Sequence, residues 1–219
     1  MLGWSRWRRR SGSVVGVTLT LGLLVLAAVV VTASLVHEPV GLFTRDITTL
    51  SSEAGARLPP YAGALGLLTF MIWASAASLS AFVAMLHSDR RIWLLMFAGL
   101  LCLLATDDSL SFHEVIGPDL GIPEWSWFVA YAAIGLALTL MMLQRVQREG
   151  MDTSVLPFLL GGVLLALSIG VDQVFPGQHL AEDGPKFLGA LMWFTVPLLS
   201  LPPEVLALMR RTTPVPEQP

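Results

Sequence analysis

Charged residues and cysteine are both scarce in this sequence. Only 13% of the 219 residues are charged, whereas a soluble domain usually carries about 25%. The one cysteine, Cys102, lies within an apolar run, where a small buried apolar role is the ordinary one. With a single cysteine, no intramolecular disulfide, CxxC redox motif or CxxCH haem-attachment motif can form.

Hydrophobic residues take the place of the missing charge. They make up 54% of the chain, the mean hydropathy is +0.70, and they gather into runs close to the ~20 residues that cross ~30 Å of hydrocarbon. We therefore predict an all-α polytopic membrane protein, a bundle of six transmembrane helices with short loops and no separate soluble domain. The expected spans are about 13–36, 61–86, 92–114, 125–144, 155–172 and 185–209, between a basic N-terminus at 1–12 and a tail at 210–219.

The first span admits two interpretations. The segment "RWRRR", an apolar run and "VTAS" are similar to a signal peptide that is cleaved near Ala33. The run is longer than usual and five further spans follow, which favours a retained signal anchor. With the N-terminus in the cytoplasm, most arginines fall on the inner side. The positive-inside rule then predicts a protein of the bacterial inner (plasma) membrane with both termini cytoplasmic.

Acidic residues follow the opposite distribution and gather at the outer ends of the spans. The third span ends in "ATDDSLSFHE", with Asp107, Asp108, His113 and Glu114. Counted from Arg91 at ~1.5 Å per residue, Asp107 lies ~24 Å along the helix, inside the outer edge of the hydrocarbon. A carboxylate at that depth is costly, and two adjacent ones must repel each other, share a proton or hold a cation.

Helical geometry places these acids on one face if the helix continues to Glu114. At ~100° per residue, the three carboxylates and the Ser111 hydroxyl share one ~120° stripe, with His113 beside it. Such a stripe normally faces the interior of a bundle or a water-filled cavity, which favours a buried polar site open to the outside. The simpler alternative is that the helix ends at Thr106 and the acids are solvated.

Two other spans carry polar groups at the same level. The fifth ends in "GVDQVFPGQHL", with Asp172 and His179, and the sixth begins "EDGPKFLG", with Glu182, Asp183 and Lys186. Acids at a helix start also serve as caps and complement the helix dipole, so that interpretation stays open for the second segment. Lys186 is the one lysine of the chain, which indicates either chance or a local need for an ammonium that neutralises the acids.

The motifs DDxxxxHE, in "DDSLSFHE", and ExxxK followed by a glycine, in "EDGPKFLG", resemble a pattern of uncharacterised bacterial multi-span membrane proteins. This resemblance covers two short segments and implies a shared site without an activity. The segment "EDGPK" also resembles the EExxK motif of PrsW-type intramembrane proteases. That resemblance implies catalytic or metal-associated roles for Glu182, Asp183 and Lys186, although the second acid is aspartate and a proline interrupts the motif.

Carboxylates and imidazoles at three converging helix ends suit a divalent metal with an open coordination position, zinc first, which activates water. The leading hypothesis is therefore a metal-dependent intramembrane hydrolase that acts on a lipid or a membrane peptide. The expected metal ligands are Asp107, Asp108, His113, Asp172, His179 and Asp183, and the expected catalytic residues are Glu114, Glu182 and Lys186.

Other functions fit the same residues. Asp107 and Asp108 suit an entry site for a cation or proton, although few polar residues continue the path inward. A structural or assembly subunit would use the polar ends to tie helices together and would bind a membrane protein partner. Haem ligation by His113 with His179 or His37 is a further alternative. Membrane lipids are the expected partners, and no nucleic acid is expected.

Overall fold

The computed structural model describes residues 2–44, 58–59, 61–175, 177–202 and 205, apart from the side chains of 2–11 and 114–115. No strand occurs within these ranges, so the all-α prediction is confirmed for them. The longer helices are α1 (Leu2–Val36), α4 (Ala64–Leu86), α5 (Arg91–Leu110), α7 (Glu124–Glu149), α8 (Val155–Val174) and α9 (His179–Leu199). The shorter elements are α2 (Gly41–Thr44), a π-helical turn η1 (Phe112–Ile116) and α6 (Gly117–Asp119).

Five helices of the described residues, and not the expected six, are long and apolar enough to cross a membrane. They are Gly12–Val36 of α1, then α4, α5, α7 and α8. The expected sixth span, 185–209, corresponds to α9. The prediction of six is wrong because the first turns of α9 carry Glu182, Asp183 and Lys186, and charged residues are costly in hydrocarbon. The five apolar helices support a membrane location.

The structure describes most of the predicted N-terminal segment but not the predicted C-terminal tail. Helix already begins at Leu2, within the segment 1–12 that we expected to be a basic terminus. The tail at 210–219 lies outside the described residues, as does most of 203–209 at the end of the expected sixth span.

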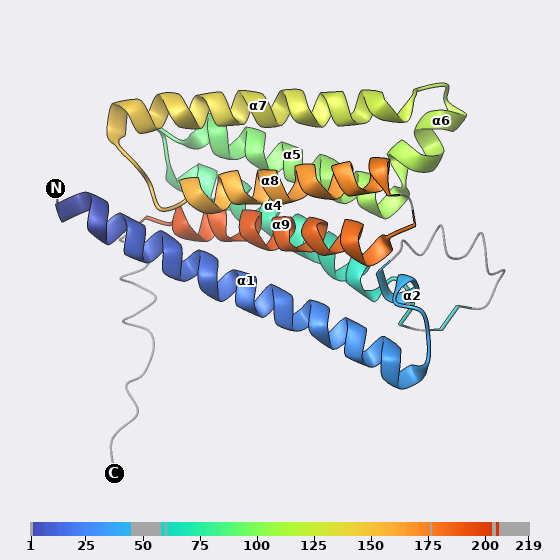
Figure 1. Ribbon diagram of the computed structural model, residues 1–219. Coiled ribbons are helices and arrows are strands. Elements are labelled where there is room, and N and C mark those ends of the chain that lie inside the picture. The colour runs from blue at the N-terminus through green and yellow to red at the C-terminus, as the bar shows by residue number, and fades with distance from the viewer. Residues whose placement is uncertain (1, 45–57, 60, 176, 203–204, 206–219) are drawn as a thin grey trace, which may run out of the picture.

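Figure 1 shows α4, α5, α7, α8 and α9 side by side, while α1 crosses this bundle at an angle. α9 packs against α8, α4, α1 and α2, and α4 pairs closely with α5. α7 rests mainly on α5 and has little contact with α8. The ends of α5 and α8 meet the starts of α7 and α9 at the end of the bundle where α2 and α6 lie (Figure 1).

We call this end the acidic end, for Asp107, Asp108, Asp172, Glu182 and Asp183, and the opposite one the arginine end, for Arg90 and Arg145. At the arginine end, Asp152 forms an ion pair with Arg90 and lies 3.6 Å from Arg145 Nη2. These contacts hold the loop between α4 and α5 against the loop between α7 and α8. Both loops are therefore held together at the arginine end, opposite the acidic end.

An aromatic cluster forms the core of the bundle. The rings of Phe158 and Trp193 stack at a centroid distance of 6.0 Å, and Phe97 and Trp73 meet Trp193 edge-on at 5.4 and 5.8 Å. Such pairs contribute about 0.5–1.5 kcal/mol each beyond the burial of their area. Trp193 Nε1 donates a hydrogen bond of 2.8 Å to the Phe158 carbonyl oxygen, so its polar atom is satisfied as well.

Gly161 of α8 makes room for the ring of Trp193. A Cβ at Gly161 would lie 2.2 Å from Trp193 Cδ1, whereas a Cβ at Gly99 of α5 would meet no atom within 4 Å. We expect Gly161→Ala to lower the thermal unfolding midpoint of the purified protein, because overpacking costs about 1–3 kcal/mol. The matched control Gly99→Ala should leave the midpoint unchanged or raise it, since alanine favours helix. Equal midpoints for the two variants would contradict this packing.

Candidate functional site

α5 ends at Leu110 because the backbone reverses at Ser111. Ser111 has φ 49° and ψ 46°, the left-handed conformation that is uncommon outside glycine, and its N–H caps the helix on the Asp107 carbonyl oxygen. The turn η1 and then Gly117 of α6 follow. The predicted acidic stripe along one helix to Glu114 is therefore wrong, since helical spacing stops at Leu110. The side chain of Glu114 lies outside the described residues.

The reversal brings His113 back onto Asp107. The backbone N–H of His113 donates to Asp107 Oδ1 at 2.9 Å, and His113 Nδ1 lies 2.8 Å from Asp107 Oδ2. Asp107 exposes only 6% of its surface, so the alternative of a helix that ends at Thr106 with solvated acids is wrong. A carboxylate that accepts the Nδ1 proton orients the imidazole and makes Nε2 its basic nitrogen.

Lys186 joins two other carboxylates that come from different helices. Its Nζ donates to Asp108 Oδ1 of α5 at 2.9 Å and lies 3.2 Å from Asp183 Oδ1, one turn earlier in α9. The Asp108 and Asp183 side chains expose 10% and 9% of their surface, and buried Thr44 of α2 lies beside Asp183. Unpaired carboxylates with so little access to water would be strongly destabilising. The geometry therefore agrees with a local need for this lysine.

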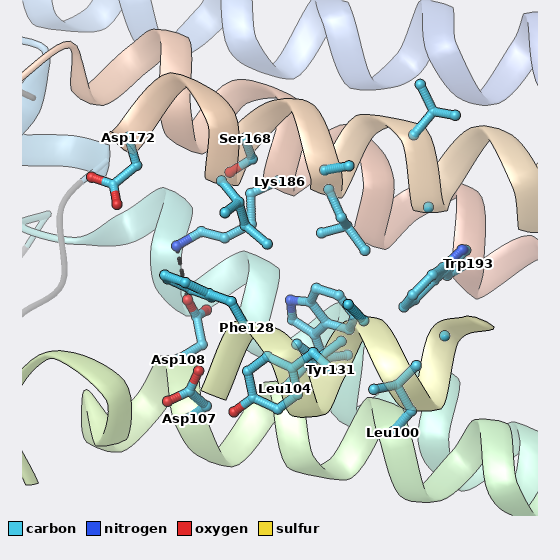
Figure 2. Close-up of a pocket in the computed structure, with 18 of the residues that line it drawn as sticks. Leu100, Leu104, Asp107, Asp108, Phe128, Tyr131, Ser168, Asp172, Lys186 and Trp193 are labelled. Atoms are coloured by element: carbon cyan, nitrogen blue, oxygen red, sulfur yellow. Dashed lines mark hydrogen bonds and ion pairs between the residues drawn. The ribbon is translucent and has the colours of Figure 1, made fainter. Parts of the chain in front are cut away.

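These groups form the polar end of a cavity of about 460 Å³ between α5, α7, α8 and α9 (Figure 2). Deeper in the cavity the lining turns apolar, with Leu100 and Leu104 of α5, Phe158 of α8 and Trp193 of α9. The volume lies within the range of small-molecule sites in proteins. The cavity is therefore amphipathic, with its charges at the acidic end and hydrocarbon-like walls toward the middle of the bundle.

α7 supplies a wall of this cavity that sequence reasoning missed. Its lining residues are Phe128, Tyr131, Ala132, Gly135 and Thr139, which share one helical face because they lie 3, 4, 7 and 11 positions after the first. Figure 2 shows the Tyr131 hydroxyl directed toward the Asp107 carboxylate. A tyrosine on one helical face with the small residues Ala132 and Gly135 was the available signal, and Tyr131 is one of two tyrosines in the chain.

Most of the expected site residues meet at this cavity. Those that line it are Asp107, Asp108, His113, Asp172, Glu182 and Lys186. Asp183 lies behind Lys186, paired with its ammonium, and Asp172 accepts a hydrogen bond of 3.1 Å from Gln173 Nε2. His179 is the first residue of α9 and does not belong to the lining.

The metal-ligand prediction finds no matching cluster in the described part of the chain. No group of three or more histidine, cysteine, aspartate or glutamate side chains there is placed to hold a metal ion. Asp107 is engaged with His113, and Asp108 shares an ammonium with Asp183. Coordination of a metal by these side chains would require those contacts to rearrange, so the zinc site stays a prediction.

One family model matches this chain, and its description is "Domain of unknown function (DUF8692)". The match covers residues 22–199, from the middle of α1 to the end of α9, and so includes the whole cavity. Neither the curated proteins nor the solved structures gave a match. An activity must therefore be argued from the geometry of the site.

The contacts of Lys186 predict a distinctive stability pattern. Lys186→Met leaves Asp108 and Asp183 without their shared ammonium, and breaking a buried ion pair in this way costs about 3–5 kcal/mol. The thermal unfolding midpoint should fall for this variant. It should partly recover in Lys186→Met/Asp108→Asn, because one of the two stranded charges is then removed. Arg148→Met, which removes an exposed arginine from the end of α7, is the control and should change the midpoint little. A double variant no more stable than Lys186→Met would contradict the pairing.

Proposed function

This chain belongs to the family of the domain of unknown function DUF8692, and we propose that it is a membrane-embedded hydrolase with a lipid-like substrate. The substrate lies in the cavity between α5, α7, α8 and α9, and its reactive group lies at the acidic end. His113, oriented by Asp107, is the general base. The distribution of arginines supports placing this end on the extracytoplasmic side.

The contact between His113 Nδ1 and Asp107 Oδ2, 2.8 Å long and in the wall of the cavity, carries the proposal. An imidazole held in this way takes up a proton at Nε2, and the carboxylate stabilises the imidazolium that forms. A water molecule gives its proton to Nε2 while its oxygen bonds to the substrate carbonyl carbon. The imidazolium then returns the proton to the leaving oxygen or nitrogen as the acyl bond breaks.

The apolar depth of the cavity supports a lipid-like substrate over a membrane peptide. Leu100 and Asp108 both line the cavity, and a separation of eight positions along a helix spans ~12 Å. A transmembrane helix with its side chains is about 10–12 Å across, so a peptide substrate would need a wide gap between these helices. A single acyl chain needs far less width, which favours the lipid-like substrate. The polar end then receives the group that joins the chain to its head.

The remaining expected catalytic residues take supporting roles in this proposal. Lys186 donates a hydrogen bond to Asp108 at the polar end of the cavity and so keeps α9 against α5. Glu182 lines the cavity and is the second candidate for the base. The catalytic role of Glu114, and the protease-like roles that the EExxK resemblance implies, stay hypotheses.

Two alternative functions each have an observation in their favour. The excess of carboxylates at the acidic end favours binding of a cation or proton, but the described lining away from that end is mainly apolar, with Thr139 and Ser168 as uncharged polar groups, which argues against a conducting path. The Lys186 bridge between α5 and α9 favours a structural or assembly role. Such a role accounts for the bridge and leaves the cavity without a purpose.

Turnover by purified protein in lipid nanodiscs tests the hydrolase proposal. We expect the wild type to cleave members of a panel of single-chain esters and amides, followed by mass spectrometry of the released chain. His113→Gln should lower the rate by about 10²–10⁴-fold, because it removes the base. Asp107→Asn should lower it as well, since an amide holds the wrong tautomer.

The matched control for these variants is Asp152→Asn, which removes a paired carboxylate at the arginine end and should leave turnover unchanged. Thermal unfolding midpoints measured alongside distinguish loss of the base from loss of the fold. A folded His113→Gln variant with wild-type turnover would refute the assignment of His113 as base.

Metal content tests the metal-dependent form of the hypothesis. In that form Asp108 and His113 would give up their present partners to hold a zinc ion, which would supply the Lewis acid that activates water. Mass spectrometry of protein purified without chelators would then find near-stoichiometric zinc in the wild type and a loss of zinc in Asp108→Ala. Turnover by protein that holds no zinc would instead assign the reaction to the Asp107–His113 pair.

A further inference from the structure

We propose that the cavity selects single-chain amphiphiles whose head group is neutral or cationic, and rejects those with an anionic head such as a phosphate monoester. The ligand enters sideways from the hydrocarbon, between α7 and α8. This inference rests on the proposed function for the location of the site, and it adds the chemical class of the ligand and its route.

The charges at the acidic end set the head-group preference. Asp107 is paired with His113, and Asp108 and Asp183 share the single ammonium of Lys186. Asp172, whose hydrogen bond comes from a neutral amide, adds a further carboxylate to the lining. Four carboxylates thus face one ammonium and one imidazole in this set, so negative charge is in excess even when the imidazole is protonated.

An anionic head group would meet this excess at short range. To bind Lys186 it would have to displace Asp108 or Asp183 from the ammonium, and the displaced carboxylate would remain where little water reaches it. Repulsion between like charges in such surroundings is much stronger than in water. Hydroxyl and ammonium groups instead donate hydrogen bonds that carboxylates accept. Selection here works mainly through repulsion of the wrong ligand.

The route of entry follows from where the cavity lining is exposed. Ala132 of α7 and Val163 and Ala166 of α8 line the cavity, and all three are exposed residues, so the cavity is accessible where these two helices face each other. Ala132 lies eight residues after the start of α7, at the acidic end, and Val163 eight residues after the start of α8, at the arginine end, so each is ~12 Å from a different end of the bundle. Both positions therefore lie within the hydrocarbon core of a bilayer, which is ~30 Å thick.

The packing of α7 fits an opening at this place. α7 rests on α5 and has little contact with α8, although the two helices follow each other in the chain. The three exposed lining residues are apolar. An acyl chain that passes between them from the bilayer therefore stays in apolar surroundings, as it was among the lipids. The ~12 Å from Leu100 to Asp108 is close to half of the ~30 Å hydrocarbon thickness. A chain drawn from one leaflet therefore reaches the acidic end with its head group.

Photolabelling in nanodiscs tests the inference with three probes that share a dodecyl chain ending in a diazirine. Their heads are a primary amine, a glycerol monoether and a phosphate monoester. Labelled peptides are quantified by mass spectrometry, and labelling of α7 and α8 at the cavity is divided by labelling of the exposed face of α1, which corrects for partition into the bilayer. We expect the amine and glycerol probes to label the cavity roughly tenfold more than the phosphate probe, about 1.4 kcal/mol.

Two pairs of variants make the result specific. Gly135 of α7 lines the cavity, and a Cβ built there would meet no atom within 4 Å. A Cβ at Gly99 of α5 would likewise meet no atom within 4 Å, but Gly99 does not belong to the lining. Gly135→Leu should therefore fill the cavity and abolish its labelling, whereas Gly99→Leu should not. Asp172→Lys should raise labelling by the phosphate probe, and Asp152→Lys at the arginine end should not.

Equal labelling of the cavity by the phosphate and amine probes would overturn the head-group assignment. Labelling that survives Gly135→Leu would overturn the placement of the ligand. Because labelling requires no turnover, a protein that selects the amine probe but hydrolyses nothing would refute the proposed function and leave this inference standing. Turnover that depends on His113, without selection among the heads, would do the reverse.

Discussion

Buried carboxylates need a compensating charge or donor, and the acidic end of this protein is arranged around that requirement. Asp107 meets it within a single segment, because the reversal at Ser111 returns a backbone N–H and an imidazole to its two oxygens. Asp108 and Asp183 meet it together through Lys186, which reaches from α9 to α5. Removal of one partner would leave a charge where water cannot solvate it. The ion pairs of Lys186 therefore hold the start of α9 against the end of α5.

This arrangement also determines the shape of the cavity. The aromatic cluster of Phe97, Phe158 and Trp193 packs the middle of the bundle, and the Lys186 bridge closes α5 onto α9 at one end. α7 joins neither contact and lies mainly against α5. The space enclosed between it and α8 is mainly apolar, with the uncharged polar groups of Tyr131, Thr139 and Ser168, and is charged at its end (Figure 2). A base at the charged end and a chain-sized apolar space beside it are the two parts that a lipid hydrolase requires.

The same charges serve more than one purpose in the proposed function. Asp107 orients the histidine, and together with its neighbours it makes the polar end negative. A head group that is attracted there also brings its linkage beside the imidazole. Selection of the substrate and activation of water thus depend on one set of carboxylates, and a substitution among them is expected to affect both. The loose contact between α7 and α8 adds the route by which a molecule dissolved in the bilayer reaches the site.

The sequence by itself determined the all-helical architecture, the approximate positions of the spans and the gathering of acids at one end, because hydrophobic periodicity and charge placement are local properties. Asp108, Asp172 and Lys186 could be assigned to a common site on that basis. The count of membrane helices failed at α9, because Glu182, Asp183 and Lys186 in its first turns are costly in hydrocarbon. The pairing of Asp107 with His113 required the left-handed backbone at Ser111, which no helical spacing encodes. The place of Tyr131 depended on which face of α7 turns toward α5. The Lys186 bridge and the place of Tyr131 arise from contacts between segments distant in the chain, 78 residues apart for Asp108 and Lys186, and only the packing of the helices decides them.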